Sequence, residues 1–334
     1  MKHGAGIYKV AKELQCSSDE IIDFSSNINS YYSKLELTQN KNMLVNYGDY
    51  FYSNLYKLVS SKLNIDMEEI KFYNGATSAI FELIKSLKQK NIYLYAPLYG
   101  EYEKASKDAG KKIYKINRFK NIYKKPKKNS IIAFVNPSTP DGKYYDLKKL
   151  FKLWRERDCT IIIDESFIEF EDLPSIRAEI RNYKNLYIVQ SFTKFYACAG
   201  VRIGAILSNK KSIKKLKTPL WNLSSLDVAF LKERLQEKTF VSKSQKKHKK
   251  NKNKLYNILK KSGLFSHIYK SDANFFLTKS SQARELFKYL LKRKILVRTC
   301  GSFDYLSNDY LRFGVKDNIL HKSLKKGLKS FINK

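Results

Sequence analysis

Residues 191–202 read Ser-Phe-Thr-Lys-Phe-Tyr-Ala-Cys-Ala-Gly-Val-Arg, and the apolar run 186–189 stands directly before them. The apolar run predicts a buried strand. A lysine this close to the end of a buried strand, Lys194, is costly to bury unless its charge is used or removed. An amine with a lowered pKa is a nucleophile toward aldehydes and can form a Schiff base. The competing interpretation is an ordinary solvated strand end, because lysine is abundant in this chain.

Phosphate-binding groups flank this lysine in the sequence. Arg202 follows it by eight residues, and the hydroxyl residues Ser191 and Thr193 precede it. A guanidinium group binds phosphate as a rigid planar fork, and the two hydroxyls could donate to the same phosphate. The stretch therefore indicates a phosphate site beside a reactive amine.

Two more apolar runs also end in polar residues. The run 131–135 precedes Asn136, and the run 160–163 precedes Asp164. Ligands of open α/β sheets lie at the carboxyl ends of the strands. We therefore expect Asn136, Asp164 and Lys194 to converge on one site.

These motifs together carry a family resemblance. The order Asn-Pro-x-x-Pro-x-Gly at 136–142, Asp-Glu-x-Phe at 164–167 and Ser-x-Thr-Lys at 191–194, followed by the arginine, resembles the fold-type I pyridoxal phosphate (PLP) enzymes. Nearly the whole chain is similar to their histidinol-phosphate aminotransferase and threonine-phosphate decarboxylase branch. The resemblance implies PLP as cofactor and a doubly wound, mostly parallel α/β sheet in a large domain, with a small α/β domain beside it. We expect the large domain at about residues 40–235 and the small domain to combine the N-terminal arm, 1–39, with 236–334.

Composition narrows the class of protein. The chain has 334 residues, enough for two domains, and a net charge of +34 that invites a nucleic-acid interpretation. Seven lysines and a histidine fall within 243–254 without interleaved aromatic residues, so a solvated helix face or loop is expected there and no nucleic-acid partner. From about residue 226 the apolar period predicts one long helix that runs through these lysines and links the domains.

Membrane and metal sites are not expected either. No signal-like segment and no run of about 18 apolar residues occurs, so no membrane span is predicted. The four cysteines are scattered without a Cys-x-x-Cys pair, which argues against a zinc site and fits a reduced cytoplasm.

The resemblance assigns roles around the cofactor. Lys194 would hold PLP as a Schiff base, Asp164 would pair with the pyridine nitrogen, and Asn136 would bond the phenolic oxygen. Tyr99 would stack on the ring, with Tyr102 as the alternative.

A small-residue turn supplies the expected phosphate cradle. Gly75, Ala76 and Thr77 precede a helix expected at 79–87, and backbone N–H groups at a helix N-terminus attract phosphate. An ordinary helix N-cap is the alternative. By resemblance this turn binds the cofactor phosphate together with Ser191, Thr193 and Arg202, which complete the expected set.

A homodimer is also implied by the resemblance. Tyr47 stands where the family has a Tyr-Pro-Asp sequence, whose tyrosine reaches the cofactor phosphate of the other subunit. Gly48 replaces the proline here, and Tyr50 or Tyr52 could take that role instead. The segment 221–224 resembles the one that closes a side of the pocket.

Substrate residues are expected at both ends of the chain. By resemblance, His3 and Arg298 would bind the substrate phosphate, and Arg312 would bind a carboxylate. Asn27 and Asn29 lie in a segment that would run along the substrate, and Asn136 would also face it; these complete the substrate set.

Two reactions remain open. Phe167 stands where the aminotransferases commonly have a tyrosine, and phenylalanine there resembles the decarboxylases. The first hypothesis is decarboxylation of a small O-phosphorylated amino acid, of the serine or threonine phosphate kind, giving a phosphorylated amino alcohol. The alternative is an aminotransferase for a small phosphate ester such as histidinol phosphate, or an amino or keto phosphate.

Overall fold

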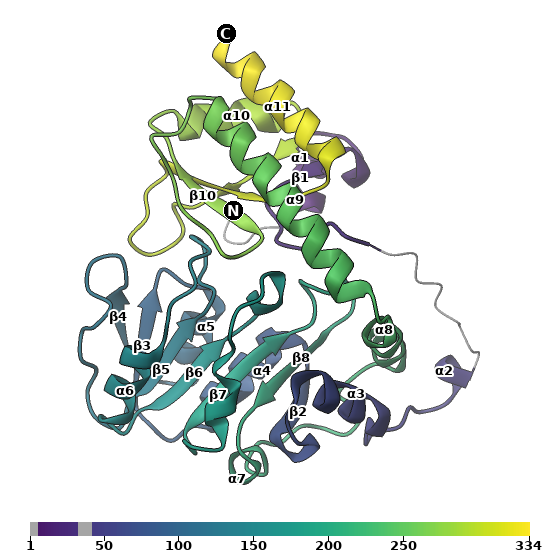
Figure 1. The fold of residues 1–334 in the computed structure, drawn as a ribbon, viewed down its shortest axis with the longest axis vertical. Coiled ribbons are helices and arrows are strands. Elements are labelled where there is room, and N and C mark those ends of the chain that lie inside the picture. The colour runs from purple at the N-terminus through teal and green to yellow at the C-terminus, as the bar shows by residue number, and fades with distance from the viewer. Residues whose placement is uncertain (1–5, 33–41) are drawn as a thin grey trace. The chain divides into compact units, whose positions relative to one another are not determined.

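The structure is a computed structural model that describes residues 6–32 and 42–334 (Figure 1). The chain divides into two compact units. The large unit comprises residues 33–136 and 145–241, and the small unit comprises 1–32, 137–144 and 242–334.

One short segment belongs to a different unit from the one the sequence suggests. Residues 137–144 fall within the expected large domain, yet they group with the small unit. Asp272 explains this, because its carboxylate accepts the Tyr144 N–H at 2.9 Å and its own N–H donates to the Gly142 carbonyl at 2.7 Å. Pairing of this kind between distant segments leaves no trace in local sequence.

A seven-stranded sheet forms the centre of the large unit (Figure 1). Its strand order is β2-β8-β7-β6-β5-β3-β4, and β8 alone runs antiparallel to its neighbours. The apolar runs fill it because a parallel strand covered on both faces must be apolar throughout. The expected doubly wound, mostly parallel α/β fold is confirmed. The strands are β2 Ile70–Asn74, β3 Asn91–Ala96, β4 Lys112–Asn117, β5 Ile131–Val135, β6 Thr160–Asp164, β7 Leu186–Ser191 and β8 Ile203–Leu207.

Helices pack on both faces of this sheet. Ile80 and Leu83 of α4 share a buried cluster with Leu94 of β3, whereas Trp154 of α6 packs edge-on against Tyr95, which points to the opposite face. The helices are α2 Asn42–Val45, α3 Ser53–Leu63, α4 Gly75–Ser86, α5 Glu101–Asp108, α6 Lys148–Arg155, α7 Lys210–Ile213 and α8 Ser225–Gln236, with 3₁₀ turns η2 Met67–Glu69, η3 Ile168–Phe170 and η4 Ile176–Ile180.

The small unit is built on a four-stranded antiparallel sheet of order β12-β13-β10-β9. A second pair, β1 with β11, ties the N-terminal segment to the C-terminal half in parallel. Leu255, Leu286, Phe313 and Leu324 belong to its apolar core. The strands are β1 Ile22–Asp23, β9 His267–Ile268, β10 Phe275–Lys279, β11 Ile295–Leu296, β12 Arg298–Thr299 and β13 Tyr310–Gly314; the helices are α1 Ile7–Glu13, η1 Ser18–Glu20, α9 Phe240–Lys261, α10 Ala283–Lys292 and α11 Asn318–Ile332.

The expected long helix from residue 226 is two helices. Helix α8 ends at Gln236 and α9 begins at Phe240. Glu237 breaks the run: its carboxylate pairs with buried Arg234 at 2.9 Å, and its carbonyl accepts the Phe240 N–H at 3.0 Å. The contacts of Glu237, which lies between the two helices, therefore end α8 although the apolar period of the sequence continues.

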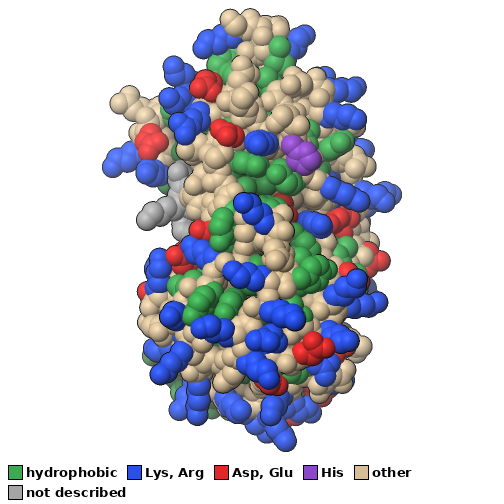
Figure 2. All heavy atoms as spheres, turned by 90° about the vertical axis from the view of Figure 1, so that its left-hand side faces the viewer, with side chains coloured by type: hydrophobic (Ala, Val, Ile, Leu, Met, Phe, Trp, Pro, Cys, Tyr) green, Lys and Arg blue, Asp and Glu red, His purple; other side chains and the backbone are tan. Residues whose placement is uncertain are grey.

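The lysine run lies on α9. Ser244, His248 and Asn251 form a buried stripe along the helix, and the lysines between them are exposed or half-buried. In Figure 2, Lys and Arg side chains are scattered over the visible face among acidic ones rather than gathered in one patch. Within residues 6–32 and 42–334, no helix has the length and apolar character needed to cross a bilayer.

His321 gives the small unit a pH-dependent stability. Its side chain is 1% exposed, Nε2 accepts the Lys316 N–H at 3.2 Å, and Nδ1 has no hydrogen-bond partner among the described residues. Burial lowers the pKa of this imidazole from 6.5 to about 4. Between pH 6.5 and about pH 4 the unfolded chain binds a proton on this imidazole and the folded chain does not. The free energy of unfolding therefore decreases as pH falls through this range.

We expect this histidine to lower the free energy of unfolding by about 2 kcal/mol between pH 7 and pH 5. Chemical denaturation of the wild type and of His321→Gln at both pH values isolates the effect, since the variant should lose less stability on acidification. Exposed His267, replaced in His267→Gln, is the matched control. Equal pH slopes for the wild type and His321→Gln would contradict the expectation.

Candidate active site

Three neighbouring strands end at one edge of the large sheet. The register pairs Val135 of β5 with Asp164 of β6, and Asp164 with Val189 of β7. The Asn136 N–H continues this pairing by donating to the Asp164 carbonyl at 2.8 Å. Parallel register therefore brings Asn136, Asp164 and the end of β7 together, as the apolar runs predict.

Asp164 presents a carboxylate that is buried without a cation. Its side chain accepts the Ser166 N–H on Oδ1 at 2.9 Å and the Tyr102 hydroxyl on Oδ2 at 3.0 Å. No basic group of the described residues lies within ion-pair distance of this carboxylate. A buried anion of this kind is costly unless a positive group faces it. The protonated ring nitrogen of PLP has the charge and the single N–H that this carboxylate lacks, so the residue fits the cofactor.

Lys194 follows β7 by three residues and is half-buried. Its Nζ lies 5.2 Å from the centre of the buried Phe167 ring, which carries no hydroxyl for it to bond. The loop that contains Lys194 is held in place by a hydrogen bond, which the Tyr196 hydroxyl donates to Glu169 at 2.6 Å. Burial raises the pKa of Glu169. Lys194 and Phe167 therefore lie close together.

The expected phosphate cradle forms the first turn of α4 rather than a turn before it. Gly75 has φ +78°, and a Cβ there would lie 2.6 Å from Nη2 of Arg202. Gly204 is constrained too, since its Cβ would approach the Ala76 nitrogen to 2.3 Å. Glycine is needed at position 75 so that Arg202 can reach the helix N-terminus, and at position 204 so that β8 can pass close to the backbone of the first turn of α4. Free N–H groups, the positive end of the helix dipole and a guanidinium meet here, which suits a phosphate.

Thr77 and two tyrosines complete this side. The Thr77 hydroxyl lies 3.3 Å from that of Tyr99, which is half-buried, whereas Tyr102 is fully buried and bonded to Asp164. Burial raises the pKa of Tyr99. The partial exposure of Tyr99 leaves it the better candidate for the ring-stacking role. Ser191 and Thr193 are also buried at this edge.

The side chain of Asn136 binds the backbone of Tyr145 and has one N–H left for a ligand. Its Oδ1 accepts the Tyr145 N–H at 2.9 Å, and its Nδ2 donates to the Tyr145 carbonyl at 3.0 Å. An amide nitrogen carries two hydrogens, so one remains for a ligand oxygen. This is compatible with the expected bond to the cofactor's phenolic oxygen.

The three tyrosine candidates for the partner-directed role are distinguished by burial. Tyr52 is 8% exposed, and its hydroxyl accepts the Leu223 N–H at 3.0 Å, so it is used inside the subunit. Tyr47 is 85% exposed, with its ring centre 4.8 Å from that of Trp221, and Tyr50 is 41% exposed. The structure therefore leaves Tyr47 and Tyr50 available to another molecule.

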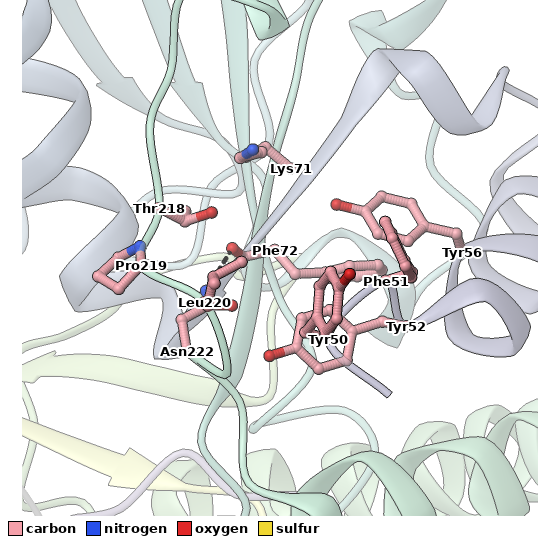
Figure 3. Close-up of a pocket in the computed structure, with 10 residues that line it drawn as sticks. All are labelled: Tyr50, Phe51, Tyr52, Tyr56, Lys71, Phe72, Thr218, Pro219, Leu220 and Asn222. Carbon is pink, nitrogen blue, oxygen red and sulfur yellow. Dashed lines mark hydrogen bonds between the residues drawn. The ribbon is translucent and has the colours of Figure 1, made fainter. Parts of the chain in front are cut away.

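A cavity of about 330 Å³ lies beside these tyrosines (Figure 3). The aromatic rings of residues 50–56 line one side, and Thr218, Pro219 and Leu220 line the other. Exposed apolar and aromatic side chains lie beside it. We call this the aromatic surface, formed by Tyr47, Tyr50, Phe51, Leu220 and Trp221. The cavity is separate from the strand-end site, since none of Asp164, Lys194 and Arg202 lines it.

Two arginines face each other in the small unit. Arg298 of β12 is the cross-strand partner of Arg312 of β13, and their exposures are 2% and 6%. Arg312 donates only to uncharged oxygens, Thr139 Oγ1 at 3.0 Å and the Ser25 carbonyl at 3.1 Å, and its Nε has no partner among the described residues. Burial lowers the pKa of Arg312 to about 10 and also lowers that of Arg298. An anion would relieve this concentration of buried positive charge.

The N-terminal segment contributes unequally. Asn27 Oδ1 is buried without a hydrogen-bond partner in the described chain, so it can accept from a ligand. Asn29 instead uses its amide within the small unit, donating to Ser244 and accepting the Tyr31 N–H at 3.0 Å. His3 lies outside the described residues.

Sequence patterns missed two contacts, one in each unit. Lys316 is 8% exposed and donates Nζ to Ser26 Oγ at 2.9 Å, which joins the N-terminal and C-terminal segments of the small unit. Tyr102 bonds Asp164 rather than stacking in place of Tyr99. No local signal marks either contact, because each depends on a partner far away in the sequence. No cluster of three potential metal ligands occurs in the described ranges.

The chain is similar in sequence to known proteins. The sequence matches the family described as aminotransferase class I and II over residues 19–329. It is 31% identical to a histidinol-phosphate aminotransferase of Clostridium kluyveri, over 72% of this chain and 71% of that protein. It is 28% identical to the adenosylcobalamin biosynthesis bifunctional protein CobDQ of Leptospira interrogans, over 94% of this chain, which spans only 39% of that longer protein.

Solved structures agree with the fold. The histidinol-phosphate aminotransferase of Clostridium acetobutylicum aligns with a TM-score of 0.80 at 29% identity, covering 93% of this chain and 98% of that one. The L-threonine-O-3-phosphate decarboxylase of Porphyromonas gingivalis also gives 0.80, at 22% identity, covering 93% and 99%. The chain therefore belongs to the class I and II aminotransferase family and is a PLP-dependent enzyme of the transferase or lyase type.

Proposed function

We propose that the protein is an aminotransferase that acts on a small amine bearing a phosphate ester, of the histidinol phosphate kind. The observation that carries the substrate class is the pair of buried arginines, Arg298 and Arg312, opposite each other on β12 and β13. An anionic ligand would offset the buried positive charge of the two arginines, and phosphate binds guanidinium donors well. The reaction class rests on the 31% identical relative, which is named as an aminotransferase.

Each residue at the strand ends would have its own role in binding the cofactor or in moving a proton. Bound PLP supplies an electron sink for negative charge at the substrate carbon next to nitrogen. Asp164 would hold positive charge at the ring nitrogen, and the α4 N-terminus with Arg202 would hold the phosphate. Tyr99 would pack on the ring face, and Asn136 would donate to an oxygen of the cofactor. Lys194 would hold the cofactor between turnovers and would then move the proton at the substrate carbon.

Decarboxylation, which the sequence alone puts first, is the second candidate. Phe167 favours it, because a ring without a hydroxyl lies 5.2 Å from the Lys194 amine, at the position where the aminotransferases commonly have tyrosine. The residues that bind the substrate would decide which of its bonds breaks, by fixing how the substrate carbon is oriented in the site. The relatives favour aminotransfer, so we place that reaction first.

One experiment separates the two reactions. PLP-loaded protein is mixed with L-histidinol phosphate, L-serine phosphate or L-threonine phosphate without any keto acid. Aminotransfer predicts one stoichiometric conversion of the cofactor to its amine form, which 2-oxoglutarate then reverses. Repeated release of carbon dioxide with an unchanged cofactor spectrum would overturn our proposal in favour of decarboxylation.

A homodimer is part of the proposal. The aromatic surface exposes Phe51 by 64% and Leu220 by 63%, and large contiguous apolar patches mark interaction sites. A second copy would cover this surface and receive Tyr47, which is the residue that the resemblance directs to the other subunit.

Light scattering after size exclusion should give twice the chain mass of 39.1 kDa. The double variant Phe51→Glu/Leu220→Glu should elute as a monomer, because charge on the aromatic surface opposes its burial. Tyr123→Glu, at a tyrosine that is 54% exposed outside this surface, is the control and should stay dimeric. A monomeric wild type would sink the proposal of a dimer.

A further inference from the structure

Tyr102 is the only side chain of the described residues that hydrogen-bonds the Asp164 carboxylate. It lies in the first turn of α5, is fully buried, and donates its hydroxyl to Oδ2 at 3.0 Å across 62 residues of sequence. The other donor to this carboxylate is the backbone N–H of Ser166, on Oδ1. Each carboxylate oxygen therefore has one donor, and the carboxylate is held in a fixed plane.

Resting on the proposed function, we infer that Tyr102 is a positioning residue that orients Asp164 and sets how strongly this carboxylate holds the ring nitrogen of the cofactor. A carboxylate oxygen has room for two donors, so Oδ2 can accept the Tyr102 hydroxyl and still accept another N–H. A hydrogen bond to the ionised form lowers the basicity of a carboxylate. Tyr102 would thus limit the negative charge that faces the cofactor.

The direction of this hydrogen bond is well defined. Burial, followed by the neighbouring Asp164 charge, raises the pKa of Tyr102 well above its usual range, so its phenol keeps its proton and donates. The other titratable groups whose charges act with Asp164 are Tyr99 and Glu165. Glu165 is bound elsewhere, to the Ser175 hydroxyl at 2.5 Å and the Ile176 N–H at 3.0 Å. No cation among the described residues lies within ion-pair distance of the carboxylate, so the Tyr102 phenol is the side-chain group in direct contact with it.

Tyr102→Phe should raise the pH midpoint at which the visible absorption of the PLP-loaded enzyme changes. Loss of the phenol leaves more negative charge on Asp164, which favours the protonated form of the cofactor–lysine linkage. If loss of the phenol instead lets Asp164 rotate away from the ring nitrogen, the ring withdraws fewer electrons from the cofactor–lysine linkage. The pH midpoint is raised in this case too. We expect an upward shift of about 0.5 to 1 pH unit.

A second variant tests the sign. Tyr102→3,5-difluorotyrosine keeps the ring and makes the phenol a stronger acid, so it strengthens the hydrogen bond and should lower the midpoint. Tyr95→Phe is the matched control, since Tyr95 is 1% exposed and accepts a bond from Trp154 Nε1 at 2.8 Å, away from Asp164. It should titrate like the wild type. Circular dichroism of each variant verifies folding.

The outcomes separate this inference from the proposed function. Opposite shifts for the phenylalanine and difluorotyrosine variants would support the role of Tyr102. Unchanged midpoints in both, with a normal visible band in the wild type, would overturn that role and leave the proposed function standing. A wild type that binds PLP without any titrating visible band would overturn the proposed function and the inference together.

Discussion

Replacing Lys194 by alanine should abolish the visible absorption band of the PLP-loaded protein and reduce turnover by at least about a thousandfold. Lys194 lies at the end of β7, at the sheet edge where Asp164 presents its carboxylate. Alanine can neither hold the cofactor covalently nor move the proton at the substrate carbon. Absorption spectra and steady-state rates of Lys194→Ala measure both losses.

Another partly buried lysine serves as the control. Lys111 is half-buried, donates to the Leu87 carbonyl and has a pKa lowered by burial, so it shares the environment of a constrained amine without facing the strand ends. Lys111→Ala should retain both the band and the rate. Full activity in Lys194→Ala would contradict the assignment of Lys194 as the lysine that holds the cofactor.

Replacing Arg298 by alanine should raise the KM for the phosphorylated substrate by about 10- to 100-fold and change kcat little. Arg298 is 2% exposed and donates Nη2 to Ser302 at 2.9 Å, so its guanidinium is fixed before a ligand arrives. The expected loss is that of a charge-assisted hydrogen bond to phosphate. Initial rates over a range of substrate concentrations separate KM from kcat.

The specificity of this effect is the decisive part. An unphosphorylated analogue should be affected much less than the phosphate ester. Arg293→Ala, at an exposed arginine that stacks on Tyr289 at 3.6 Å, should leave both substrates unaffected. An equal rise in KM for both substrates in Arg298→Ala would show that this residue does not bind the phosphate.

The sequence predicts the large sheet well, for a physical reason. Runs such as 131–135 and 186–189 are apolar at every position because they are covered on both faces, and all their residues are buried. Polar residues directly after such runs can lie only at the sheet edge. The convergence of Asn136 and Asp164 follows from parallel register, which fixes neighbouring strand ends side by side.

Other features depend on distant partners and could not be predicted. The break between α8 and α9 comes from Glu237 bound to a buried arginine, while the apolar period continues across it. The hydroxyl of Tyr102, on α5 after β3, reaches Asp164 at the end of β6 only in the folded sheet, where β5 alone separates these two strands. Periodicity describes which face of an element is buried, and it carries no information about which polar group lies opposite.

Reduction of the PLP-loaded protein with borohydride, followed by peptide mapping, tests the central claim most directly. The chain contains 54 lysines, so the position of the modified lysine is a demanding observation. We predict a single reduced cofactor adduct on Lys194. A stable adduct on any other lysine, with Lys194 unmodified, would contradict the active site at the ends of β5, β6 and β7.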